Sequence, residues 1–445
     1  MIPLVHNIAP GAGAATIAGT IEAGIADGRL GPGDRLPTVR DLAAALGVSP
    51  ATVAAAYKDL GQRGLISANR RRGTVVASQP PLRVRGARPV PAGATDLASG
   101  NPDPAQLPPL GPALARIDPA PKLYGGPAKL PRLAALAQAG FAADGIPADG
   151  VTGGLAIAGG AMDGIERVLQ AHLRAGDRVA VEDPGWPRIG DLVRALGLRP
   201  EPVAVDQSGP VPGELARALE RGARAVIVTP RGQNPTGAAV DPPRGRELRE
   251  VLAQHRHVVL IEDDYVAAVA GAPYVPLHTA SDRWAVIRSL SKVLGPDLRV
   301  APMAGDPLTI SRVEGRQLLG PGWVSHLLQQ TAAELWASPE TRDLLALTGA
   351  RYAERRAALV DALAGHGIPA HGRSGLGVWV PLAEETATVQ QLAERGWAVS
   401  PGERFRFRTP PGIRITTTSL DPARAADLAA AISEAVTASP ATYAG

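Results

Sequence analysis

Short apolar segments alternate with helical patterns over most of this chain, from about Asp96 onward. Four of these segments have the length and composition of strands: Val179–Asp183, Ala225–Thr229, Val258–Glu262 and Ala285–Ser289. Helical patterns such as Gly213–Gly222 and Arg244–Gln254 lie between them. Because the strand segments are apolar at nearly every position, we expect them to be buried on both faces, which is typical of an α/β fold with a mainly parallel sheet. Ligands bind such sheets at the carboxyl ends of the strands, so functional residues are expected just after these segments.

The first part of the chain has a different pattern, in which three short helices are expected. Apolar residues at helical spacing place the first helix over Ile17–Ile25. Thr38, with Asp41 three residues later, forms a capping box that begins the second helix. Ser49 then caps a third helix, and Pro50 occupies its first position, where the missing N–H costs nothing.

Two short strands follow the third helix, which is expected to end near Arg63. The strands are Leu65–Ile66 and Thr74–Val76, and a basic tip that contains Arg71 joins them. Helix, turn, helix and a basic hairpin is the arrangement of a winged helix-turn-helix domain, whose third helix enters the major groove of DNA. An ordinary small α/β subdomain is the alternative.

Composition restricts the class of protein further. The chain has 445 residues, of which 45% are hydrophobic and 20% charged, as expected for a soluble protein with more than one core. It has no apolar run of membrane-spanning length and no secretion signal at its start, so we expect a cytoplasmic protein that does not contact membranes. It has 0 cysteines, which excludes disulfides, zinc-thiolate sites and thiol catalysis. His255 and His257 have no third ligand nearby in the sequence, and no metal site is expected.

Positive charge is concentrated in the first 90 residues. They contain 11 Arg or Lys and 5 Asp or Glu, giving 11 − 5 = +6, so the remaining residues sum to 4 − 6 = −2. This asymmetry favours a nucleic-acid-binding module attached to a nearly neutral body. Residues 78–95 are rich in proline and lack a periodic apolar pattern, which is typical of a linker. We therefore predict a DNA-binding domain over 1–77, a linker over 78–95 and a second domain over 96–445.

The segments Gly33–Ala43, Leu46–Val53 and Ala56–Leu60 closely resemble the GntR family of bacterial regulators, and the likeness extends to Gly73 and Val76. The resemblance implies a surface for double-stranded operator DNA made by Arg35, Thr38, Arg40, Ser49, Pro50, Thr52, Arg71 and Gly73. Within this set, Arg40 and Ser49 stand at positions that usually contact DNA, and Pro50 replaces a frequent arginine. Arg35 and Arg71 are expected to meet phosphate, which positions the domain without specifying sequence.

One lysine stands out in a chain that has only four. Lys292 follows the strand segment Ala285–Ser289, and Arg299 comes seven residues later. An amine that can form a Schiff base and a guanidinium that can bind phosphate are the groups that pyridoxal phosphate requires. Taken alone, a surface lysine is the alternative. Together with the segments described next, however, the region from Asp96 to the C-terminus resembles the fold-type I aminotransferases, which implies a smaller C-terminal subdomain beside the sheet.

This resemblance implies roles for residues at several strand ends. Asp263 would hold the pyridine nitrogen protonated, Tyr265 and Asn234 would contact the ring hydroxyl, and Trp186 would stack on the ring. Lys292 would form the Schiff base. The phosphate would be held by Arg299 and by the helix start at Gly160, Ala161 and Met162, with Ser289 and Ser291 close by. The alternatives are an acidic strand end, a Pro-Gly turn and a core tryptophan.

Two further residues are implied at the edges of the site. Arg414, in Gly412–Thr416, matches the arginine that grips a substrate carboxylate in aminotransferases. Tyr124 resembles the residue that reaches the phosphate of the partner subunit, which implies a homodimer.

The order of the two domains resembles the MocR subfamily of GntR regulators, in which an aminotransferase-like domain senses pyridoxal phosphate or an amino compound. The run Thr52–Lys58 and the short linker resemble the subgroup associated with vitamin B6 supply. We therefore predict a transcription regulator. The alternative is an active aminotransferase with an appended DNA-binding domain, and a relic of either domain is a third hypothesis. Residues Val266–Ala268, where such regulators often carry acidic side chains, leave the first two open.

Overall fold

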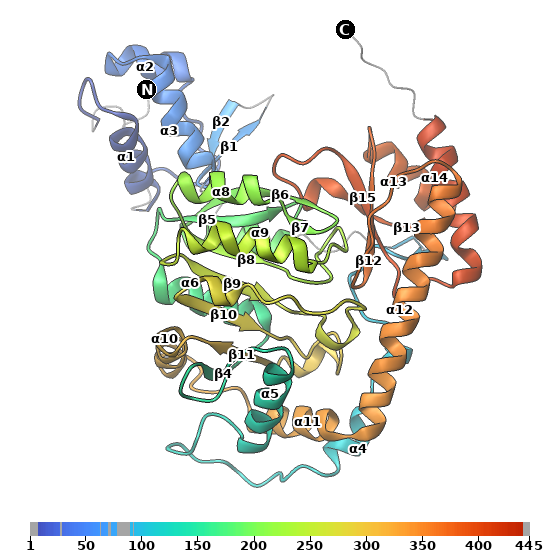
Figure 1. Ribbon diagram of the computed structural model, residues 1–445. Coiled ribbons are helices and arrows are strands. Elements are labelled where there is room, and N and C mark those ends of the chain that lie inside the picture. Colours follow the sequence, from blue (N-terminus) through green and yellow to red (C-terminus); the bar gives the residue numbers. More distant parts are fainter. Residues whose placement is uncertain are drawn as a thin grey trace. The chain divides into compact units, whose positions relative to one another are not determined.

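The computed structural model describes residues 8–26, 29–62, 64–69, 73–77, 90–91 and 93–438 (Figure 1). The chain divides into two compact units, and we describe each by itself. The first unit contains the described residues up to Ala77, together with 174–178 and 188–200. The second unit contains the remaining described residues.

The N-terminal elements form three helices and a two-stranded sheet. They are α1 (Ala14–Ala26), α2 (Val39–Leu46), α3 (Pro50–Gln62), β1 (Ile66–Asn69) and β2 (Gly73–Val76). Thr38 caps α2 by accepting a hydrogen bond from the Asp41 N–H at 3.2 Å. Gly47 ends the same helix in the left-handed conformation, at φ 63°, which a residue without a Cβ adopts at no steric cost. These elements confirm the predicted helix-turn-helix.

The same elements share one apolar core. Ile17 and Ile21 of α1 pack with Leu46 of α2 and with Val53 and Leu60 of α3, and all five side chains are buried. Strands β1 and β2 are antiparallel, with Ile66 opposite Val76, which confirms the predicted wing. The tip of the wing, including the predicted phosphate contact Arg71, lies outside the described residues, as does most of the predicted linker.

An eight-stranded mixed sheet forms the centre of the region that follows the N-terminal elements. Its strands are β4 (Gly154–Ala158), β5 (Arg178–Asp183), β6 (Arg199–Asp206), β7 (Gly209–Pro210), β8 (Ala223–Val228), β9 (Val259–Asp263), β10 (Arg283–Ile287) and β11 (Ala301–Gly305). Their order is β4-β11-β10-β9-β8-β5-β6-β7. Strands β8, β9 and β10 are mutually parallel, whereas β11 is antiparallel to both of its neighbours, β10 and β4. Because β4 therefore runs in the same direction as β8, β9 and β10, the loops that follow these four strands meet at one edge.

Helices connect and cover these strands. They are α4 (Leu110–Leu114), α5 (Pro131–Ala143), α6 (Ala161–His172), α7 (Pro187–Ala195), α8 (Pro212–Glu220), α9 (Pro242–Ala253), α10 (Pro307–Leu318) and α11 (His326–Ala337). Side chains from α5, α8 and α9 form one buried cluster with those of β8, β9 and β10. Helices α9 and α10 begin in the same way. Asp241 and Asp306 are their N-caps, and in each helix the first residue is proline.

A smaller C-terminal part has its own sheet and core. It contains α12 (Pro339–Gly365), α13 (Thr386–Glu394), α14 (Ala425–Ala438), β12 (Gly377–Pro381), β13 (Trp397–Ala398), β14 (Ser400–Pro401) and β15 (Gly412–Thr416). The sheet order is β12-β15-β14, and β13 pairs with β3 (Thr95–Asp96), which brings the start of the second unit to this part. The long helix α12 contacts α11 and also β12 and α14, so it links the two parts of this unit (Figure 1). The predicted α/β fold with a smaller C-terminal subdomain is confirmed.

None of the helices in the described part of the chain combines the length and apolarity needed to cross a membrane. The same residues contain no group of three or more His, Cys, Asp or Glu side chains that could hold a metal ion.

Candidate cofactor site and DNA-binding surface

Lys292 and Arg414 both contact the short segment Ala98–Gly100, near the start of the second unit. The Lys292 ammonium donates a hydrogen bond to the carbonyl oxygen of Gly100, and Nη2 of Arg414 donates to the carbonyl oxygen of Ala98. Arg414 lies on β15, whereas Lys292 lies on the loop after β10. Residues far apart in the sequence therefore assemble around a common site.

The environment of Lys292 makes its ammonium group easier to deprotonate than that of an exposed lysine. Burial, together with the positive charges of Arg414 and Arg299, lowers the pKa of this lysine to about 8. A neutral amine is the nucleophilic form of lysine, so this residue is suited to attack an aldehyde.

Asp263, the last residue of β9, is a buried carboxyl group without a partner. Its side chain is 4% exposed, and Oδ1 accepts no hydrogen bond from the described residues. Burial, together with the nearby carboxyl groups of Asp264 and Glu182, raises the pKa of Asp263 to about 8. A buried acceptor of this kind normally has a partner, so the site lacks a donor that a ligand would provide.

Two further predicted ring-binding residues follow the parallel strands β9 and β8. The Tyr265 hydroxyl donates to the carbonyl oxygen of Gly232 at 2.7 Å. Asn234, on the same loop as Gly232, accepts a hydrogen bond at 3.5 Å from Nη1 of Arg414. Arg414 therefore contacts both Asn234 and the carbonyl oxygen of Ala98, and the Tyr265 hydroxyl is bound to the loop that carries Asn234.

The start of α6 forms a cradle for an anion. Gly160 has φ 109°, and a Cβ added there would overlap Nη2 of Arg299. The guanidinium of Arg299 therefore lies over the first turn of α6, where the N–H groups of Ala161 and Met162 have no partner within the helix. A helix N-terminus with an arginine beside it is a suitable site for a phosphate group.

Ser289 and Ser291 are both buried in the loop that carries Lys292. The Ser291 N–H donates to Oγ of Ser289 at 3.3 Å, and Oγ of Ser291 has no partner among the described residues. These two hydroxyls, like the carboxyl group of Asp263, are available to a ligand.

The predicted DNA-contacting residues of the first unit lie at the starts of α2 and α3. Arg40, Thr38, Ser49 and Pro50 are exposed, and Ser49 accepts a hydrogen bond from the Thr52 N–H at 3.1 Å. Arg35 lies beside the wing, where its Nε would be 3.2 Å from a Cβ added to Gly73. Gly73 itself has φ 74°, which explains why glycine is suited to this position.

The cofactor residues pass a simple test of fit to pyridoxal phosphate. The unpartnered Asp263 carboxyl matches a ring N–H, the neutral amine of Lys292 matches the aldehyde, and the cradle at Gly160 and Arg299 matches the phosphate.

Comparison with known proteins agrees with both sites. Residues 95–432 match the family described as aminotransferase class I and II, and residues 14–76 match the bacterial regulatory proteins of the gntR family. The chain is 42% identical to the Vitamin B6 salvage pathway transcriptional repressor PtsJ of Salmonella typhimurium, over 92% of this chain and 95% of that protein. The chain belongs to the MocR subfamily of GntR-family transcription regulators.

Other relatives agree with this assignment. The HTH-type pyridoxine biosynthesis transcriptional regulator PdxR of Corynebacterium glutamicum is 29% identical and aligns over 76% of each chain. The crystal structure of LysN, the alpha-aminoadipate aminotransferase of Thermus thermophilus, superposes with a TM-score of 0.68 at 22% identity, covering 80% of this chain and 96% of that one. This MocR regulator therefore has the fold of an aminotransferase, binds DNA and uses pyridoxal phosphate as its cofactor.

Two further residues predicted for the site of this regulator are Trp186 and Tyr124. Trp186 is partly buried, and its neighbour Gly185 donates a backbone hydrogen bond at 2.7 Å to Phe405, whose ring lies 5.0 Å from the Arg414 guanidinium. Tyr124 is 92% exposed and makes an edge contact with Trp323, with ring centroids 5.4 Å apart. The stacking role of Trp186 and the partner-subunit role of Tyr124 stay predictions.

Sequence reasoning missed the residues that shape the loops. Gln233 donates to the buried Glu182 carboxylate at 3.0 Å and accepts a hydrogen bond from the N–H of Thr236, which holds the loop that carries Asn234. Asp183 accepts backbone hydrogen bonds from Phe407 and Arg408, each at 2.8 Å. Glu182 and Asp183 could have been noticed because they stand at the end of a strand segment. Their partners, however, are more than 40 residues away in the sequence, so the contacts themselves could not be predicted.

Proposed function

We propose that this chain is a repressor of genes for vitamin B6 supply and that its affinity for operator DNA changes when pyridoxal phosphate occupies the site around Lys292. One observation carries the proposal: a DNA-binding domain and a complete set of cofactor-binding groups occur on the same chain. The identity with a vitamin B6 salvage repressor over nearly the whole chain supports the choice of regulated genes.

Each cofactor-binding residue has a distinct task in this proposal. Pyridoxal phosphate supplies a reactive aldehyde and an electron-withdrawing ring. Lys292 would hold the aldehyde carbon through its side-chain amine, and Asp263 would keep the ring nitrogen protonated. Arg299 and the first turn of α6 would bind the phosphate. Asn234 and Tyr265 would orient the ring through its hydroxyl group.

Arg414 would allow the site to bind a second kind of ligand in addition to pyridoxal phosphate. Its guanidinium has a buried Nε without a partner in the described region, and burial lowers its pKa to about 10, so it remains charged at neutral pH. We propose that it binds the carboxylate of an amino compound, which displaces the hydrogen bond to Ala98. An amino compound as well as the cofactor itself would then act as effector.

The remaining features of the proposal concern assembly. A homodimer, with Tyr124 reaching the phosphate of the partner subunit, would present two winged helices to a repeated operator. The domains would be 1–77 and 96–445, joined by the linker 78–95. Because a transcription regulator acts on chromosomal DNA, we propose a cytoplasmic location.

The absorption spectrum of the purified chain, combined with DNA binding, tests the proposal. Pyridoxal phosphate should give a visible band that requires Lys292, and it should change the affinity for an operator fragment. A band without any change in DNA affinity would contradict the sensing role. Sustained conversion of an amino donor and a keto acceptor would favour the alternative, an aminotransferase with an appended DNA-binding domain.

A further inference from the structure

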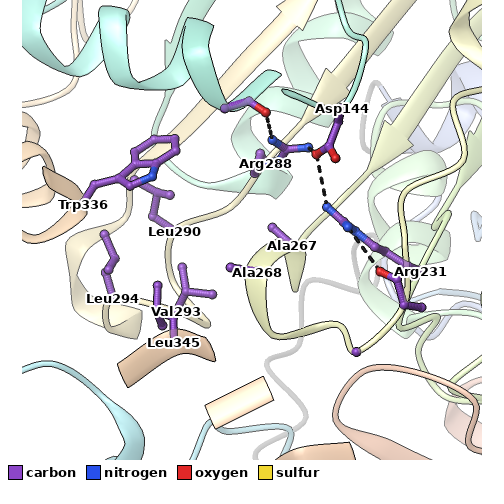
Figure 2. Close-up of a pocket in the computed structure, with 13 residues that line it drawn as sticks. Asp144, Arg231, Ala267, Ala268, Arg288, Leu290, Val293, Leu294, Trp336 and Leu345 are labelled. Atoms are coloured by element: carbon purple, nitrogen blue, oxygen red, sulfur yellow. Dashed lines mark hydrogen bonds and ion pairs between the residues drawn. The ribbon is translucent and has the colours of Figure 1, made fainter. Parts of the chain in front are cut away.

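We propose that this regulator has a second small-molecule site, separate from the cofactor site, that binds an apolar α-amino acid as a zwitterion. The site is a cavity of about 470 Å³ in the second unit (Figure 2). None of the predicted cofactor residues lines it. Its volume falls within the range of roughly 300–1,000 Å³ that is usual for small-molecule sites.

One end of the cavity is apolar. It is formed by Leu290, Val293 and Leu294 from the loop that carries Lys292, by Trp336 of α11 and by Leu345 of α12. Figure 2 shows these side chains gathered on one side of the opening. An aliphatic or aromatic side chain would gain free energy by leaving water for this surface.

Small residues keep the cavity open. Ala267 and Ala268 stand between its apolar and polar ends, and Gly271 and Ala272 also line it (Figure 2). A larger side chain at any of these four positions would fill part of the space.

The opposite end carries two arginines and two aspartates. Arg231 binds Asp264 through Nε at 2.7 Å and Nη2 at 2.9 Å, and Arg288 donates to the same carboxylate from Nε at 2.9 Å. Nη2 of Arg288 donates to Oδ2 of Asp144 at 2.6 Å. Two positive and two negative groups leave this end without net charge, so a ligand with a net charge would be poorly matched to it.

The ammonium and carboxylate groups of a zwitterion match one oxygen atom and one N–H group of this cluster that are not already hydrogen-bonded. The Asp144 side chain is 28% exposed, and its Oδ1 accepts no hydrogen bond from the described residues, so it can accept one from an ammonium group. Nη1 of Arg231 donates only to the carbonyl oxygen of Ala272, at 3.3 Å, which leaves an N–H for a carboxylate. An α-amino acid carries both groups on one carbon, and its side chain would extend toward Trp336 and Leu290.

The cavity shares its walls with the cofactor site. Leu290 and Val293 lie within two residues of Lys292, and Ala267 lies two residues after Tyr265. Asp264, at the polar end, directly follows Asp263. An amino acid in the cavity would therefore contact the same loops that carry the cofactor-binding groups.

Calorimetric titration of the full chain, without pyridoxal phosphate, tests the proposal with L-leucine as the probe. L-leucine should bind, whereas isocaproate, which lacks the ammonium, and isoamylamine, which lacks the carboxylate, should each bind at least about tenfold more weakly, because a hydrogen bond to a charged group is lost. Absence of binding by L-leucine, or equal binding by either half-molecule, would overturn the proposal.

Variants separate this site from the cofactor site. Ala268→Phe should fill the cavity and weaken L-leucine binding by at least about tenfold, whereas Ala364→Phe, at an exposed position near the end of α12, should leave it unchanged. Arg414→Ala removes the guanidinium proposed to bind a ligand carboxylate in the cofactor site. This variant should also leave L-leucine binding to the cavity unchanged. Binding that is lost in Arg414→Ala and kept in Ala268→Phe would assign L-leucine to the cofactor site instead.

Asp144→Asn tests the ammonium contact directly. It should lower the affinity for L-leucine by about tenfold and leave the affinity for isocaproate unchanged. Because this substitution also removes one of the two carboxylate partners of Arg288, circular dichroism should accompany it. Ala268→Phe tests the site independently of that ion pair. Unchanged affinity of folded Asp144→Asn for L-leucine would contradict the proposed role of Asp144.

Discussion

Asp263 and Asp264 are consecutive in the sequence, yet their carboxyl groups have opposite environments. Asp264 is bound by the guanidinium groups of Arg231 and Arg288, which hold its pKa below the usual value despite complete burial. Asp263 has no such partner, and its pKa is raised to about 8. Successive residues at the end of a strand point to opposite faces of the sheet, so one acid is free for a ligand and the other forms part of the structure.

The first prediction concerns Asp263→Asn and pH. In the chain without cofactor, an ionised Asp263 is disfavoured in the folded state but not in the unfolded state, where its pKa is about 3.9. The wild-type carboxyl group therefore lowers stability progressively as pH rises from about 4 to about 8. Asp263→Asn should be more stable than wild type by over about 1 kcal/mol at pH 9, and the difference should vanish near pH 4.

Thermal unfolding across this pH range would measure the effect. With saturating pyridoxal phosphate, the wild type should instead be more stable than Asp263→Asn, because the variant cannot form an ion pair with a protonated ring. A stability difference that does not depend on pH would contradict the raised pKa.

The second prediction concerns the attachment of the cofactor. Lys292→Ala and Lys292→Arg should both abolish the visible band, because arginine keeps the charge but cannot form a Schiff base. With a lysine pKa of about 8, the attachment rate should rise with pH and level off above that value, since only about one tenth of the amine is neutral at pH 7. Stopped-flow absorbance measures this rate. Lys129→Arg is the control, and a band that persists in Lys292→Arg would refute the assignment.

Two adjacent glycines provide the third prediction. A methyl group at Gly160 would overlap Arg299 and would require a positive φ, whereas one at Gly159 would lie 3.4 Å from the Asp163 carboxylate at an ordinary φ. Gly160→Ala should weaken pyridoxal phosphate binding by at least about tenfold through loss of phosphate contacts. Gly159→Ala should have a much smaller effect. Equal dissociation constants of the two variants, measured by fluorescence titration, would argue against the cradle.

The fourth prediction concerns DNA. Arg40→Ala should weaken binding to a DNA fragment selected by the wild-type protein and should leave cofactor uptake unchanged. A base contact would cost roughly 1–3 kcal/mol at one position of the operator, and a phosphate contact would lower the salt dependence of binding by about one ion. Fluorescence anisotropy at several salt concentrations distinguishes these cases. Arg256→Ala, which removes an exposed ion pair with Asp282, is the control. Unaltered DNA affinity in Arg40→Ala would show that the predicted surface is misplaced.

Local patterns were sufficient to predict most elements of this protein. The apolar run before Asp263 became β9, and the Thr38 cap, the turn at Gly47 and the proline at position 50 began or ended helices where they were expected. These features depend on neighbouring residues in the chain: capping, backbone freedom and the spacing of apolar side chains. The family motifs around Lys292 and Arg40 were similarly local, and they predicted the cofactor and the DNA-binding role.

Only the tertiary structure decided what surrounds each functional group. The sequence places two carboxyl groups side by side at 263 and 264. Arg231 and Arg288, which neutralise one of them, come from the loops after β8 and β10, the strands on either side of β9. Gly100 and Lys292, which are hydrogen-bonded, are 192 residues apart in the sequence, and Ala98 and Arg414 are 316 residues apart. Burial, charge pairing and cavity volume depend on contacts between distant segments, and a single sequence carries no direct record of those contacts.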